Sequence, residues 1–173
     1  AISENRAGIP MALAIGAINS RLVNLGIRSF ASINVQTSEA LDTHSFAVLL
    51  GVGATTINSY IAFDSIYQRY EKGLFGKISF DECVQRYVTS VDNGLLKIMS
   101  KMGISVLSSY RGGCNFEAVG LSRSVVAEYF PGMISRISGI GIIGIEKKIK
   151  MLHEKAFQKN ISVLPIGGTD IFF

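Results

Sequence analysis

The side chains with the clearest chemical potential lie in one short segment, Ser108-Ser109-Tyr110-Arg111-Gly112-Gly113. Arg111 offers a planar guanidinium that suits a carboxylate or a phosphate, and the two glycines allow a ligand to approach the backbone closely. The alternative interpretation is structural, with Arg111 paired to an internal carboxylate such as Glu117 so that it fixes the loop. The segment follows Ile104–Leu107, which we expect to be a buried strand, and parallel α/β folds place their sites after strands.

Two other stretches hold polar side chains at comparable positions. Gln36 and Thr37 follow a strand that we predict over Ile27–Val35. We predict a short strand over Thr55–Tyr60 from its β-branched residues, and Asn58 is the first residue of the loop at the end of this strand. Loops that follow parallel strands gather at one edge of a sheet or barrel. The candidate loop residues are therefore Gln36, Thr37, Asn58, Ser109, Tyr110 and Arg111.

A glycine motif offers a second kind of chemistry. Residues 139–144 match G-x-G-x-x-G and precede a predicted helix, a pattern that in dinucleotide-binding proteins places a pyrophosphate on the helix N-terminus. However, Met133–Ser138 is a poor strand, and no acidic residue follows about 20 positions later at a strand end. We therefore interpret the motif as a glycine-rich entry to a helix.

The histidines and cysteines do not form a recognisable metal or nucleophile set. His44 and His153 have no second ligand at a suitable spacing, and Asp42 does not share a helix face with His44. We expect Cys83 to be buried as a small hydrophobic residue, and Cys114 has no histidine nearby in sequence to act as a base. The sequence predicts no catalytic residue, no metal and no cofactor in this chain.

The helix that the sequence marks most clearly follows Ser79 and stops at Gly103. Ser79 and Glu82 form an S-x-x-E capping box, and the apolar residues behind them recur with a 3.6-residue period. Gly94 is a weak point inside this helix. Further helices are predicted over Ile9–Leu25, Ser38–Leu50 (opened by Thr37 or Ser38), Ile61–Tyr70, Ser122–Tyr129 and Ile142–Phe157.

Helices and short strands alternate along the chain with brief connections, which indicates parallel strands joined by right-handed crossovers. Either a doubly wound sheet or a barrel satisfies this pattern. A complete (β/α)₈ barrel needs ~250 residues, and we count only three or four strands in 173 residues. We therefore predict an α/β fold with a partial (β/α) barrel-like parallel sheet, in which residues 1–173 form a single partial domain.

The composition excludes several functional classes. The net charge of +4 is too mild to indicate nucleic-acid binding, and the longest apolar stretch, Gly8–Ile18, is too short to span a membrane. Hydrophobic residues make up 48% of the chain and charged residues only 17%, which excludes a disordered chain. Such an apolar excess is typical of a surface that belongs inside a larger assembly. The two cysteines favour a reducing, cytoplasmic setting.

The segment around the arginine loop resembles a known family. Residues Lys97–Ser105, Ser109–Gly112 and Phe116–Leu121 closely resemble the large subunit of glutamate synthase. Other similar stretches are the run from Gly8-Ile9-Pro10 to Leu25-Gly26-Ile27-Arg28, His44–Ala47 with Gly51, Gly53 and Ala54, Asn58–Phe63, Tyr129–Phe130 with Gly132, Ser135–Ile137 and Gly139. The resemblance covers nearly the whole chain in order.

The resemblance implies that the chain is the C-terminal part of the family's central domain, with residues 160–173 leading towards an absent FMN-binding synthase domain. In that family, glutamate is made by reductive transfer of the glutamine amide nitrogen to 2-oxoglutarate. FMN and an iron–sulfur cluster take part, and Cys83 and Cys114 are not the clustered set that such a cluster needs. The central domain has an implied structural role, since it joins two active sites and helps to wall an ammonia passage. The candidate loop residues thereby become candidates for channel or interface positions.

Three hypotheses follow. The first is a non-catalytic fragment, inactive alone, whose partners are the remaining glutamate synthase domains. The alternative is a free-standing interaction module from a split gene, which assembles in trans with those domains and whose apolar faces could also support self-association. A third hypothesis, an independent enzyme acting on a phosphate ligand, would use Arg111 and the glycine loops.

Overall fold

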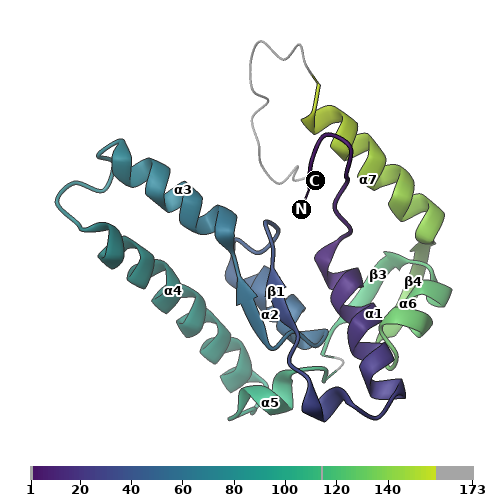
Figure 1. The fold of residues 1–173 in the computed structure, drawn as a ribbon. Helices are drawn as coiled ribbons and strands as arrows, with labels where there is room; N and C mark the ends of the chain where they lie inside the picture. Colours follow the sequence, from purple (N-terminus) through teal and green to yellow (C-terminus); the bar gives the residue numbers. More distant parts are fainter. Residues whose placement is uncertain (1, 114, 159–173) are drawn as a thin grey trace. The chain divides into compact units, whose positions relative to one another are not determined.

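The computed structural model describes residues 2–113 and 115–158 (Figure 1). Contacts within the chain divide it into two units, one formed by Ile9–Gly141 and the other by Ala1–Gly8 with Ile142–Phe173. Each unit is described by itself. Residues 160–173, which we predicted to lead towards an FMN domain, lie outside the described residues.

The larger unit holds two small parallel sheets of two strands each. In each sheet a helix lies between the two strands in the sequence and connects them. β1 (Asn34–Gln36) pairs with β2 (Thr56–Asn58), and β3 (Glu117–Leu121) pairs with β4 (Ile134–Ile140). The helices are α1 (Met11–Asn24), the 3₁₀ helix η1 (Arg28–Phe30), α2 (Thr43–Gly51), α3 (Tyr60–Glu71), α4 (Phe80–Lys101), α5 (Leu107–Tyr110) and α6 (Arg123–Tyr129). The predicted α/β class and parallel strand pairing are confirmed.

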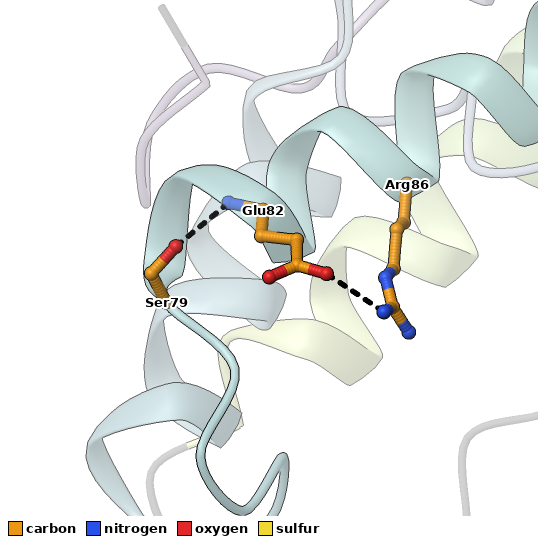
Figure 2. Close-up of polar contacts among 3 residues, drawn as sticks. All are labelled: Ser79, Glu82 and Arg86. Atoms are coloured by element: carbon orange, nitrogen blue, oxygen red, sulfur yellow. Dashed lines mark hydrogen bonds and ion pairs between the residues drawn. The ribbon is translucent and has the colours of Figure 1, made fainter.

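Helix α4 begins and ends as its sequence predicts. The Ser79 hydroxyl accepts a hydrogen bond from the Glu82 amide at 3.2 Å, and the Glu82 carboxylate turns instead to Arg86, 2.7 Å away (Figure 2). At the other end Gly103 adopts φ +69°, and the amides of Gly103 and Ile104 bond to carbonyls of the last turn. This is the Schellman arrangement, in which glycine tolerates the left-handed backbone.

Two clusters of buried side chains hold the larger unit together. The first joins α1 to the β1–β2 sheet through Ile15, Val35 and Leu49. The second joins α2 to the end of α4 and to α5 through Ala47, Met99 and Tyr110 and related neighbours. Burial of such side chains supplies the main favourable term in folding. Ile57 of β2 packs against both clusters, so the β1–β2 sheet is held by residues far apart in sequence.

Three predictions about strands were wrong. Ile104–Leu107 is not a strand, because after Gly103 the amides of Ser109 and Arg111 bond locally to Val106 and Leu107 and form α5. The strand predicted over Ile27–Val35 begins only at Asn34, after the helical turn η1. The segment Met133–Ser138, which we considered a poor strand, enters β4 at Ile134, because β3 lies beside it as a partner.

Helix α2 starts later than predicted. Its N-cap is Asp42, whose carboxylate accepts a hydrogen bond from the Ser45 amide at 2.8 Å, so the helix does not open at Thr37 or Ser38. The hydrogen bond from the Ser45 hydroxyl, followed by the one from the Ser45 amide, lowers the pKa of Asp42. The carboxylate of Glu39, upstream of the cap, accepts a hydrogen bond from the Met11 amide at 3.0 Å and so caps α1.

The smaller unit contains α7 (Ile142–Ala156) and the N-terminal residues. A ring nitrogen of His153 lies 2.9 Å from the carbonyl oxygen of Glu4, and the His153 ring packs against Phe157. The His153 side chain thus makes structural contacts within this unit. Among the described residues, no helix is both long and apolar enough to cross a membrane.

Candidate functional site

The carboxyl ends of β1 and β2 meet at one edge, as predicted. Gln36 and Asn58 are register partners, and the Thr37 amide donates to the carbonyl oxygen of Asn58 at 3.0 Å. Gln36 and Asn58 are exposed, whereas Thr37 is buried and its hydroxyl accepts a hydrogen bond from the Glu39 amide at 3.0 Å. Of the three candidate residues at this edge, Gln36 and Asn58 therefore have side chains exposed to a ligand or partner.

Ser59, which follows this edge directly, was not among the predicted site residues. Its side chain is almost fully buried, and its hydroxyl donates a hydrogen bond to the carbonyl oxygen of Ala40. A buried hydroxyl is costly unless it is paired. Ser59 thereby ties the end of β2 to the segment between β1 and α2. The feature of the sequence that could have identified Ser59 is its position directly after β2.

The Ser108–Gly113 segment does not lie in a loop after a strand. Ser109 and Tyr110 belong to α5, where Ser109 is exposed and Tyr110 is buried. The Tyr110 hydroxyl donates to the carbonyl oxygen of Ala47 at 3.2 Å, and its ring meets Phe116 edge-on. Burial raises the pKa of Tyr110. This arrangement makes Tyr110 a core residue that joins α5 to α2.

Arg111 does not pair with Glu117. The carboxylate of Glu117 instead lies 3.6 Å from the guanidinium of Arg136 on the neighbouring strand. Arg111 is half-buried and lies close to Arg28. The pKa of Arg28 is lowered mainly by burial of its own guanidinium and also by the positive charge of Arg111. The Gly112 amide next to it donates to the carbonyl oxygen of Gly51 at 3.0 Å. The arginine segment thus lies against the end of α2.

Arg28 is the arginine whose contacts are best defined, and sequence analysis did not single it out. Its Nε donates to the Asn19 Oδ1 at 2.7 Å, its Nη1 to the Ala31 carbonyl at 2.6 Å and its Nη2 to the Gly53 carbonyl at 2.8 Å. The rigid guanidinium fork suits such a three-way contact. Arg28 therefore fixes α1, the residue after η1 and the turn after α2 relative to one another.

Two cavities in the larger unit adjoin these residues. The larger, about 220 Å³, lies among α2, β2, α3 and α4 and is lined by aromatic and aliphatic side chains with hydroxyls and one carboxylate. Its walls include Phe46, Phe63, Tyr87, Ser59 and Asp92. A second cavity of about 50 Å³ is lined by Asn19, Gly51, Gly112 and neighbouring residues. Both have room for molecules the size of water or ammonia.

The first glycine of the G-x-G-x-x-G motif has a packing role. A side chain at Gly139 would collide with the carbonyl oxygen of Gly120 on the paired strand. Gly120 itself adopts φ +79°, a backbone conformation that glycine tolerates best. The close approach of β3 and β4 therefore accounts for Gly139, and the positive φ accounts for Gly120.

The described residues contain no cluster of three or more histidine, cysteine or acidic side chains that could hold a metal ion. His44 is exposed on α2, and Cys83 is buried in α4 as expected. Cys114 lies outside the described residues. The best-defined polar side chains here, those of Arg28, Ser59 and Tyr110, hold backbone segments in place, and this is an arrangement that can position elements around a cavity.

Comparison with known proteins identifies a single family. A family model described as the glutamate synthase central domain matches residues 1–122. The large chain of glutamate synthase [NADPH] from Azospirillum brasilense is 55% identical over 168 residues, which is 97% of this chain and 11% of that protein. The corresponding chain from Bacillus subtilis is 40% identical over 169 residues, or 98% of this chain and 11% of that protein.

A relative with a different named electron donor shows similar coverage. Ferredoxin-dependent glutamate synthase 2 from Synechocystis is 38% identical over 165 residues, which is 90% of this chain and 11% of that protein. This chain thus spans about one ninth of the length of the relatives it matches. The similarity extends beyond residue 122, where the family model stops.

Proposed function

We propose a scaffolding function for this chain, which belongs to the glutamate synthase central-domain family. In this proposal the chain contributes structure to a glutamate synthase large chain and holds part of the wall of the passage that carries ammonia between two active sites. The parent reaction transfers the amide nitrogen of glutamine reductively to 2-oxoglutarate. The chain itself supplies no reacting group.

The observation that carries the proposal is the use of its polar side chains. Arg28, Ser59 and Tyr110 all donate to backbone carbonyls of other segments. Such contacts pre-organise a backbone but leave no nucleophile or base aimed at a ligand. The 220 Å³ cavity beside Ser59 adds support, since it combines apolar walls with a few hydroxyls and has room for a small neutral molecule.

The proposal is tested by grafting these 173 residues into the A. brasilense large chain in place of its own matching segment. We expect the graft to form glutamate from 2-oxoglutarate with either glutamine or added ammonia as nitrogen source. A control in which a flexible Gly/Ser linker replaces the segment should retain more ammonia-dependent than glutamine-dependent synthesis, because ammonia released from glutamine would escape. Equal losses of both activities, or none, would contradict a role in the passage.

The alternative is assembly in trans, in which the chain acts as a separate interaction module. The apolar excess of the chain supports it, since an open apolar surface favours association. Co-expression of this chain with a large chain lacking the matching segment tests it. Co-purification of the two in equal amounts would support assembly in trans, whereas a cleanly monomeric 173-residue chain would count against it.

A further inference from the structure

The β3–β4 sheet has one covered face and one open face. Helix α6 connects the two strands and packs against both, with Val125 and Val126 buried. Ala118, the second residue of β3, is buried as well, whereas its neighbour Val119 is 65% exposed. Because successive side chains of a strand point to opposite faces, α6 covers the Ala118 face and leaves the Val119 face bare.

The register of the two strands collects aliphatic side chains on this bare face. Val119 pairs with Ile137 and Leu121 with Ile140, so two steps along β3 correspond to three along β4. Partnered residues of parallel strands point to the same face. Because of the register shifts, every third residue of β4, rather than every second one, points to the same face of the sheet. We call Val119, Leu121, Ile134, Ile137 and Ile140 the open face.

Four of the five side chains of the open face, all except the half-buried Leu121, are exposed far beyond what is usual for a parallel sheet. Ile134, Ile137 and Ile140 are 53%, 62% and 42% exposed. Parallel sheets occur almost only where both faces are covered. The glycine pair described above, Gly120 and Gly139, permits the close strand approach at the register shift. The sequence thus specifies the irregular register that gathers the isoleucines.

The open face has the layout of a protein interface. It is aliphatic along its length and polar at one end, where Arg136 and Glu117 form an exposed ion pair. An apolar centre with a polar rim is typical of interfaces whose centre excludes water. The occupant follows from the comparisons, since the relatives carry this segment within a polypeptide about nine times longer.

We propose that the open face binds an aliphatic strand or helix face from the part of the glutamate synthase large chain that lies outside these 173 residues. This inference rests on the proposed function, because it names the surface through which the scaffold joins its neighbours. The contact is non-covalent and buries the exposed isoleucines of β4. A second copy of this chain is the competing occupant.

Hydroxyl-radical footprinting read by mass spectrometry tests the proposal directly. The modification rate of the peptide containing Ile134–Ile140 is compared between the isolated chain and the graft in the A. brasilense large chain. We expect this rate to fall at least about fivefold in the graft, because water is excluded from an interface core. The peptide containing Leu74, 65% exposed between α3 and α4, serves as the comparison site.

The outcomes separate this inference from the proposed function. An active graft whose Ile134–Ile140 peptide is modified as fast as in the isolated chain would overturn the inference and leave the scaffold function standing. Protection of the peptide in the isolated chain, together with a dimeric mass, would also overturn it, since a second copy would then be the occupant. An inactive graft with the peptide protected would support the inference and count against the proposed function.

A substitution provides an independent check. Ile137→Glu should leave the isolated chain as stable as before, because an exposed side chain is changed. In the graft it should reduce the yield of folded large chain by about tenfold, since it buries a carboxylate without a partner. The matched control, Leu74→Glu, should leave that yield within about twofold. Equal effects of the two substitutions would contradict the proposal.

Discussion

The hydroxyl of Tyr110 donates a hydrogen bond to the carbonyl oxygen of Ala47 across 63 positions of sequence, and both residues are buried. This contact joins the short helix α5 to α2, and the ring of Tyr110 packs edge-on against Phe116. A residue that sequence analysis placed in a candidate loop is therefore part of the core. Its contact gives the first prediction.

Replacing Tyr110 by Phe should lower the free energy of unfolding by about 1–2 kcal/mol, because the Ala47 carbonyl loses its buried donor. Tyr110→Ala should cost about 3–5 kcal/mol, since it also removes the ring from the core. Urea unfolding followed by circular dichroism measures both. Ser109→Ala, at the exposed neighbour, is the control and should stay within about 0.5 kcal/mol. A Tyr110→Ala variant as stable as this control would refute the core assignment.

The same residue predicts a dependence of stability on alkaline pH. Burial raises the pKa of Tyr110 in the folded chain above its ordinary value of 10.0. The folded state therefore holds this proton at pH values where the unfolded state has lost it, and stability falls as pH rises above about 10. The decline should be shallower in Tyr110→Phe. The test measures the unfolding midpoint of both proteins as a function of pH. An equal decrease of the midpoint with rising pH in the two proteins would contradict this prediction.

Arg28 should be intolerant even of lysine. Its three donor groups reach Asn19, Ala31 and Gly53 at once, and a lysine ammonium on a flexible stem cannot reproduce that fork. We expect Arg28→Lys to lower the free energy of unfolding by about 2 kcal/mol or more, since charged hydrogen bonds are lost. The exposed Arg21 of α1 provides the matched substitution, Arg21→Lys. Thermal unfolding measures both variants, and an equal change in unfolding temperature for the two substitutions would argue against the three-way contact.

Gly94 in the middle of α4 should be required by the packing of α2. A Cβ atom there would lie 2.5 Å from Cγ2 and Oγ1 of Thr43. Gly94→Ala alone should therefore destabilise the chain, although alanine is the better helix former by about 1 kcal/mol. Combining it with Thr43→Ala should recover stability, because the collision is removed. A double-mutant cycle measured by urea unfolding should give a clear positive coupling, and strict additivity would exclude the close contact.

Local sequence signals predicted most helices well. The Ser79 cap, the 3.6-residue period behind it and the Gly103 stop are all interactions between residues a few positions apart, and α4 follows them closely. Helix α2 was misplaced at its start because Asp42, rather than Thr37, supplies the cap. Thr37 instead lies at the end of β1, where its amide donates to the Asn58 carbonyl and its hydroxyl accepts from the Glu39 amide.

The strands were harder to predict because a strand depends on a partner elsewhere in the chain. β3 and β4 are individually unremarkable sequences with glycines, and only their pairing and the cover of α6 make them strands. The same limit applies to the site. Gln36 and Asn58 met at one edge as predicted, whereas the contacts of Arg28 and Ser59 depend on distant carbonyls that no local pattern reveals.

We propose that this chain contributes structure, and no chemistry of its own, to a glutamate synthase large chain. The most direct measurement is a turnover assay of the purified, folded 173-residue chain with glutamine, and separately with 2-oxoglutarate, ammonia and a reductant. We predict no glutamate formation above the buffer control in either assay. Turnover that co-purifies with the chain and disappears on unfolding would contradict the claim.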